Sequence, residues 1–222
     1  MEERVVSPAE LVQGSPEWHA ARLGKVTASC FGKVMTPSRS KGEGLSQTSL
    51  GYMTKLIGER LSGVPADELN NKYVAWGHEH EPIAREMYEW DLEGNHAIHR
   101  VGFCVHPKYE DVGYSPDAFV DDDGLVEIKC PYNVENHLAV LEGDLIADKD
   151  YQWQCQGGLW VTGRKWLDYV SFHPLMPEKL RMHVIRIERN EDMIEDLEAA
   201  VTRFLDQMHI RLSKIRKAVD LV

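Results

Sequence analysis

The sequence predicts an α/β protein with a central mixed β-sheet flanked by helices. Helical patterns extend to about residue 92, strand patterns follow between residues 99 and 131, and helices then separate these strands from two more. Because helices that alternate with groups of strands pack on the faces of a sheet, this order favours a layered core. No repeat, low-complexity tract or long linker interrupts the chain, so we expect residues 1–222 to form a single domain.

The N-terminal helices are marked by their start signals. Ser15 before Pro16 is an N-cap followed by proline at the first helical position, which predicts a helix to about Arg22. Thr27 is a candidate cap for a second helix over residues 28–35. A loose stretch at 36–47 precedes helices expected over 48–62 and 75–92, the latter with apolar residues at helical spacing: Trp76, Ile83, Met87 and Trp90.

Three segments rich in apolar, β-branched and aromatic residues predict strands at 99–106, 113–121 and 124–131. The acidic turn Asp121–Gly124 joins the last two and indicates a hairpin. The remaining elements are expected to be helices at 134–141 and 150–161, strands at 166–172 and 182–188, and a long helix at 191–217.

Composition favours an ordinary soluble globular protein, with 43% hydrophobic and 27% charged residues. The first ten residues carry no apolar core segment, and no window is apolar enough to span a membrane, so we expect a cytoplasmic protein. Cys30, Cys104, Cys130 and Cys155 lie far apart without a C-x-x-C pair, which favours mostly buried thiols over disulfides or a cysteine metal site.

The net charge of −11 argues at first against a nucleic-acid partner, but its distribution is uneven. Residues 61–160 hold 6 basic and 20 acidic side chains, whereas residues 19–60 hold 7 basic and 2 acidic ones. Residues 19–60 are therefore a candidate segment for binding a polyanion such as a nucleic acid.

The predicted hairpin gathers charged residues that suit phosphodiester chemistry. Glu127 and Lys129 share one face of their strand, Ile128 faces the opposite layer, and Asp117 on the partner strand lies within reach. Converging carboxylates favour a hard divalent cation such as Mg²⁺, and a lysine beside them can orient or deprotonate water or stabilise a negative transition state. The same short pattern equally fits a surface hairpin with an ordinary Glu–Lys ion pair.

Two helical residues extend this candidate site. Glu81 lies on the helix expected at 75–92, where it is either a further metal ligand or a solvated carboxylate. Gln154 lies on the helix expected at 150–161 and either holds a water or phosphate oxygen or belongs to a polar stripe. Near the N-terminus, Arg22 combines with Thr27 and Ser29 into a plausible monophosphate pocket, the alternative being plain helix capping by Thr27.

Taken together, these stretches resemble the phage lambda exonuclease family of YqaJ-like viral recombinases, which belongs to the PD-(D/E)xK nucleases. The resemblance covers most of the chain, in the order WHAARLGKVTAS (18–29), AWGHEHEPIAR (75–85), YSPDA (114–118), LVEIKCP (125–131) and YQWQCQGGLWVTGRK (151–165). It implies a restriction-endonuclease-like core.

By position, the resemblance implies that Asp117 and Glu127 bind metal ions together with the backbone carbonyl of Ile128. Lys129 matches the catalytic lysine of the family, Glu81 the glutamate at a second metal, and Gln154 the glutamine that helps to place the attacking water. The implied cofactor is Mg²⁺, two ions per site, with Mn²⁺ as a substitute.

The resemblance also implies a pocket for the 5′-phosphate of the DNA. Arg22, Ser29 and Ser115 match its residues, with Thr27 beside them, and Val74 stands where the family has an apolar wedge that splits the terminal base pair.

The implied activity is 5′-to-3′ digestion of double-stranded DNA ends, which releases mononucleotides and leaves 3′ overhangs for recombination. The implied partners are DNA ends, two further copies of the chain in a ring trimer, and a single-strand annealing protein, inside a bacterial host and encoded by a phage or prophage. A sequence-specific endonuclease and a catalytically inactive DNA-end binder remain alternatives. The branch of nucleases with an iron–sulfur cluster does not fit, because its cysteine cluster is missing from this sequence.

Overall fold

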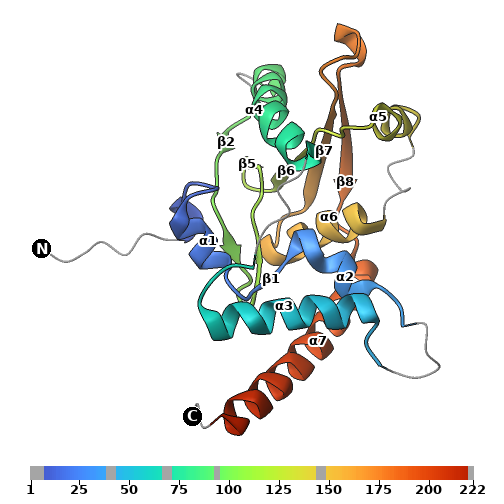
Figure 1. The fold of residues 1–222 in the computed structure, drawn as a ribbon. Coiled ribbons are helices and arrows are strands. Elements are labelled where there is room, and N and C mark those ends of the chain that lie inside the picture. Colours follow the sequence, from blue (N-terminus) through green and yellow to red (C-terminus); the bar gives the residue numbers. More distant parts are fainter. Residues whose placement is uncertain (1–7, 39–43, 67–71, 93–95, 144–148, 220–222) are drawn as a thin grey trace, which may run out of the picture.

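The computed structural model describes residues 8–38, 44–66, 72–92, 96–143 and 149–219, and these residues form two sheets flanked by helices (Figure 1). The larger sheet has the strand order β2-β5-β6-β7-β8 and the smaller one β1-β4-β3. The strands are β1 (Val26–Thr27), β2 (Ile98–His99), β3 (Cys104–Val105), β4 (Val112–Tyr114), β5 (Ala118–Val120), β6 (Gly124–Lys129), β7 (Trp166–Phe172) and β8 (Met182–Glu188). The pairs β6–β7 and β1–β4 are parallel and the others antiparallel, which confirms the predicted mixed α/β fold.

Helices cover both faces of the larger sheet. They are α1 (Pro16–Arg22), α2 (Phe31–Met35), α3 (Gln47–Ser62), α4 (Lys72–Leu92), α5 (Val134–Leu141), α6 (Lys149–Thr162) and α7 (Glu191–Ala218), with short 3₁₀ turns at Pro8–Glu10, Ala28–Cys30 and Glu178–Leu180. In Figure 1, α4 lies near the top of the molecule, and α3 and α7 lie at the bottom.

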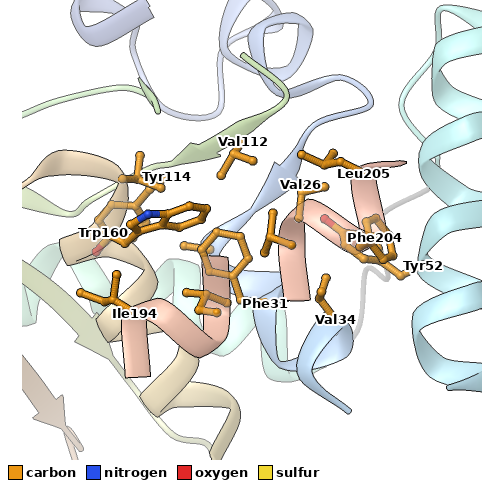
Figure 2. Packing of buried hydrophobic residues seen from close by; sticks show 14 of the residues in the cluster. Val26, Phe31, Val34, Tyr52, Val112, Tyr114, Trp160, Ile194, Phe204 and Leu205 are labelled. Atoms are coloured by element: carbon orange, nitrogen blue, oxygen red, sulfur yellow. The ribbon is translucent and has the colours of Figure 1, made fainter. Parts of the chain in front are cut away.

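Strand β6 separates two apolar clusters because its side chains alternate between the faces. Leu125 packs into the larger cluster with residues of α2, α3, α6 and α7, part of which is shown in Figure 2. Val126 and Ile128 point to the other face and pack with Ala84 and Tyr88 of α4. A residue of β6 therefore belongs to one cluster or the other according to its position in the alternation.

The helix start signals are confirmed in part. The Ser15 hydroxyl accepts a hydrogen bond from the backbone of Trp18 at 3.2 Å, as expected for the N-cap of α1. Thr27 makes no side-chain cap, because it is held extended in β1 by the pairing with β4 and is followed by a 3₁₀ turn before α2. The predicted helix at 28–35 is thus wrong in its first turn, and α4 begins three residues before the expected residue 75.

Two of the predicted strands are divided between the sheets. In the segment 99–106, His99 is the last residue of β2 in the larger sheet, and Cys104–Val105 form β3 in the smaller sheet. The segment 113–121 is likewise divided between β4 in the smaller sheet and β5 in the larger one. The second break falls at Ser115 and Pro116, where proline has no N–H to donate to a ladder. In the loose stretch at 36–47, residues 39–43 lie outside the described residues.

The prediction of mostly buried cysteine thiols is confirmed for two of the four. All four cysteines are free thiols, with Cys130 and Cys155 buried and Cys30 and Cys104 half-buried. Within the described residues, no helix combines the length and the apolar character needed to cross a membrane.

Candidate active site

A cluster of polar side chains surrounds Glu127 near the end of β6. Its Oε1 atom accepts hydrogen bonds from Lys129 Nζ at 2.6 Å and from Gln154 Nε2 at 2.5 Å. Its Oε2 atom accepts one from the hydroxyl of Tyr114 at 2.7 Å. Three donors from β6, α6 and β4 therefore hold a carboxylate that is only 4% exposed.

Asp117 lies beside this cluster, just before β5. Its Oδ2 atom accepts the backbone N–H of Ile128 at 2.7 Å, and its Oδ1 atom pairs with Arg85 Nη2 at 2.8 Å. The N–H and C=O of one strand residue point to the same side of the strand. Since the N–H of Ile128 faces Asp117, its carbonyl oxygen faces the same side, beyond the N-terminal end of β5.

Glu81 reaches the cluster from α4. It lines a cavity of about 850 Å³ together with Asp117 and Arg85, and a second cavity of about 320 Å³ together with Lys129. Burial and the nearby charge of Asp117 raise the pKa of the Glu81 carboxyl, while Lys129 opposes the shift. The structure thus brings all three predicted acidic residues to one end of the larger sheet.

Burial and neighbouring charges shift the pKa values of Glu127 and Lys129. It raises the pKa of the Glu127 carboxyl, Asp117 adds to this, and Lys129 and Tyr114 counteract it. For Lys129, burial lowers the ammonium pKa, but the charge and hydrogen bond of Glu127 outweigh it and raise the pKa above its ordinary value. Direct contact with Lys129 therefore offsets part of the cost of burying the Glu127 carboxylate.

Two glycines of α6 allow the close packing that positions Gln154 and Tyr114. A Cβ atom on Gly158 would lie 2.8 Å from the Tyr114 ring, and one on Gly157 would lie 2.1 Å from the Phe31 ring. Because side chains do not tolerate such contacts, glycine is needed for α6 to lie against both rings.

A second polar group is centred on Ser115. Its hydroxyl accepts hydrogen bonds from Arg22 Nη1 at 2.8 Å and from the indole N–H of Trp18 at 3.0 Å. The Arg22 guanidinium also lies over the Trp18 ring, 4.1 Å from its centroid. These contacts fix the arginine one helical turn from the tryptophan.

Arg22, Thr27 and Ser29 line one cavity of about 180 Å³. Lys25 and Lys55 add positive charge to it, and Glu59, which pairs with Lys55, adds a negative charge. The Thr27 and Ser29 hydroxyls are 3.4 Å apart. Ser115 joins this cavity to the acidic cluster, because it contacts Arg22 and stands two residues before Asp117. The predicted phosphate-binding residues thus lie together and next to the predicted metal ligands.

Val74, the predicted wedge, is exposed at the start of α4 and lines the 320 Å³ cavity with Lys129. Sequence reasoning assigned no role to Arg85, Tyr114 or Trp18, although each contacts a predicted site residue. Arg85 follows Glu81 by one helical turn and Trp18 precedes Arg22 by one turn, so the i, i+4 spacing was a usable signal.

The ligand types present fit a hard divalent cation. Carboxylates and a backbone carbonyl are the oxygen ligands that Mg²⁺ takes in proteins. In the side-chain positions of the described residues, no three or more His, Cys, Asp or Glu are gathered closely enough to hold a metal. The oxygens of Asp117 and Glu127 contact Arg85 and Lys129.

Comparisons with known proteins find similar sequences and structures. The sequence profile of the YqaJ-like viral recombinase domain matches residues 17–165. The alkaline exonuclease LHK-Exo from Laribacter hongkongensis is 35% identical over 94% of this chain and 100% of its own, with a TM-score of 0.81, and 0.82 for its complex with dAMP. A phage-related exonuclease from Haemophilus somnus shares the fold, at 20% identity over 86% of this chain and 96% of its own and a TM-score of 0.69. No curated protein sequence matches significantly.

Proposed function

Since the chain belongs to the family of YqaJ-like viral recombinase domains, we propose that it is a Mg²⁺-dependent DNA exonuclease. It digests one strand of a duplex end in the 5′-to-3′ direction, releases mononucleotides, and leaves a 3′ overhang for recombination by single-strand annealing. The observation that carries this proposal is the cluster of Asp117, Glu127 and Lys129 at the end of β6.

Each residue of the cluster has a part in phosphodiester hydrolysis. Asp117, Glu127 and the Ile128 carbonyl would hold one Mg²⁺, and Glu81 would contribute to a second. Bound Mg²⁺ polarises the phosphoryl oxygen and activates water. Lys129 supplies positive charge next to the reacting phosphate, where negative charge grows in the transition state. Gln154, fixed on Glu127, helps to place the attacking water without adding charge.

The Arg22 cavity sets the length of the product. The guanidinium of Arg22 and the hydroxyls of Ser29 and Ser115 suit a terminal 5′-phosphate, with Thr27 beside them. Because Ser115 contacts Arg22 and stands two residues before Asp117, a phosphate bound at Arg22 lies near the acidic cluster. This favours release of one nucleotide at a time. Val74 is exposed next to the cluster, and its small apolar side chain would help to separate the terminal base pair.

Linear duplex DNA incubated with the protein and Mg²⁺ tests the proposal. We expect mononucleotides from 5′-phosphorylated ends and a growing 3′ overhang. Discrete internal fragments would instead identify a sequence-specific endonuclease, and binding without any product would identify an inactive end binder. Ca²⁺ in place of Mg²⁺ is expected to permit end binding without cleavage, because Ca²⁺ accepts looser geometry and activates water poorly.

The proposal extends to partners. On the family resemblance, residues 1–222 form one exonuclease domain and three copies close into a head-to-tail ring around DNA, which keeps the substrate threaded during digestion. A solution mass near three times 25.3 kDa is expected, and a monomer mass would contradict the ring.

A single-strand annealing protein would load onto the exposed strand in the cytoplasm of a bacterial host. Co-purification of the exonuclease with such a protein tests this partnership.

A further inference from the structure

Two tyrosines and a lysine form an exposed group beside the candidate active site. The rings of Tyr73 and Tyr132 meet edge to face, with centroids 5.2 Å apart, and are 52% and 41% exposed. Lys72 Nζ lies 5.0 Å from the Tyr73 centroid and 4.7 Å from that of Tyr132. Trp76 packs behind Tyr132 at 5.4 Å. We call Lys72, Tyr73 and Tyr132 the tyrosine platform.

This platform is continuous with the acidic cluster. Tyr73 and Val74 line the cavity of about 320 Å³ that also contains Glu81 and Lys129. Tyr151 lines its other wall, with its ring centroid 5.5 Å from Lys129 Nζ. A chain that lies in this cavity therefore passes from the catalytic lysine to the face of Tyr73.

The platform and the phosphate cavity are connected to Glu81 through different cavities. Trp18 and His19 line the cavity of about 850 Å³ that contains Glu81 and Asp117, and His19 also lines the Arg22 cavity. The cavity that leads to Tyr73 contains Glu81 and Lys129 but none of these N-terminal residues. A strand whose 5′-phosphate is bound at Arg22 would thus pass Asp117 and Glu81 before it reaches Tyr73.

We propose that the Tyr73 ring of the tyrosine platform, which packs edge to face against Tyr132, stacks an unpaired nucleobase of the strand being cut, on the 3′ side of the scissile phosphate, while Lys72 contacts the adjoining backbone phosphate. The inference rests on the proposed nuclease function and adds a nucleobase-binding site to it. Aromatic side chains bind bases of any sequence, because every base offers a π-face, and a neighbouring cation adds backbone attraction. Both properties suit an enzyme that digests DNA without regard to sequence.

Photo-crosslinking tests the contact directly. The full-length protein is bound in Ca²⁺ to 5′-phosphorylated duplexes with 5-iododeoxyuridine at the second or third nucleotide of the 5′ strand, or at the 3′ terminus of the complement. Irradiation followed by peptide mass spectrometry is expected to show Tyr73 or Tyr132 attached to the 5′ strand. Attachment only from the complementary strand, or attachment at other residues alone, would overturn the inference.

Matched variants test its contribution. Tyr73→Ala is expected to weaken end binding in Ca²⁺ about 5- to 150-fold, the range for loss of one stacked base. Tyr132→Ala removes the ring that Tyr73 packs against and is expected to weaken binding less. Tyr73→Phe and Tyr132→Phe keep the rings and are expected to bind like the wild type. Trp90→Ala is the control, because this aromatic residue of α4 is 75% exposed and does not line the cavity.

The salt dependence of end binding tests the role of the Lys72 charge. Lys72→Ala is expected to reduce the salt dependence of end binding by about one phosphate contact, whereas Lys72→Arg preserves it. If the wild type digests duplex ends and the double variant Tyr73→Ala/Tyr132→Ala binds them equally well, the platform is wrong and the nuclease function stands. If the wild type digests no DNA, the proposed function itself fails.

Discussion

Lys129→Ala is expected to slow the hydrolysis of 5′-phosphorylated duplex ends about 10²- to 10⁴-fold, the usual loss when one group that stabilises a transition state is removed. The reason is position: Lys129 is the cation that touches Glu127 and lines the cavity with Glu81. End binding in Ca²⁺ is expected to persist, because both carboxylates and the Arg22 cavity are unchanged. Single-turnover kinetics beside a binding titration separates the two effects.

The fold of this variant needs its own control. Glu127 keeps the hydrogen bonds of Tyr114 and Gln154 when Lys129 is removed, and thermal unfolding shows whether they suffice. Lys165→Ala removes a lysine whose side chain is 70% exposed and which pairs with Asp123 at the far end of the hairpin. This control is expected to digest DNA at the wild-type rate. Undiminished turnover of Lys129→Ala would show that the lysine has no part in the reaction.

Arg22→Ala is expected to lower activity about 10- to 150-fold on 5′-phosphorylated ends, which is the effect of one lost hydrogen bond to a charged group. Arg22 is held by Ser115 and by the Trp18 ring, so its guanidinium is oriented before a phosphate arrives. Ends with a 5′-hydroxyl carry no terminal phosphate and are expected to lose much less. The ratio of kcat/KM on the two kinds of end is the measurement.

The Arg22→Ala variant has two controls. Arg22→Lys retains the charge without the planar fork and is expected to fall between the wild type and Arg22→Ala. The 5′-hydroxyl substrate reports any general damage to the fold, since Trp18 loses its packing partner in the alanine variant. Equal losses on both kinds of end would remove the argument for a phosphate pocket.

Local features of the sequence predicted much of this architecture. The bounds of α5, β7 and β8 agree with the expected ranges, and the start of α1 follows from Ser15 and Pro16. The face shared by Glu127 and Lys129 was predictable because alternation along a strand is a local property. The family and the mixed α/β fold were likewise recognisable from the motifs along the chain.

Contacts between distant elements were not predictable in this way. The pairing of Asp117 with Arg85 depends on how α4 crosses the larger sheet, and the support of Glu127 by Tyr114 depends on where β4 ends. The division of the segment 113–121 between two sheets had a local signal in Pro116, but which strand each half would join is decided by tertiary packing. The existence of the platform similarly required the packing of Tyr73 against Tyr132.

The alternation along β6 makes the candidate site an all-or-none product of folding. The turn before Gly124 fixes which residues of β5 and β6 are opposite each other, with Ala118 opposite Val126. A slip of one residue would turn Glu127 and Lys129 into the apolar cluster under α4 and expose Ile128 to Tyr114 and Gln154. No half-aligned arrangement keeps both clusters satisfied. The burial of Ile128 under α4 and the correct placement of Glu127 and Lys129 therefore depend on the same register of β6.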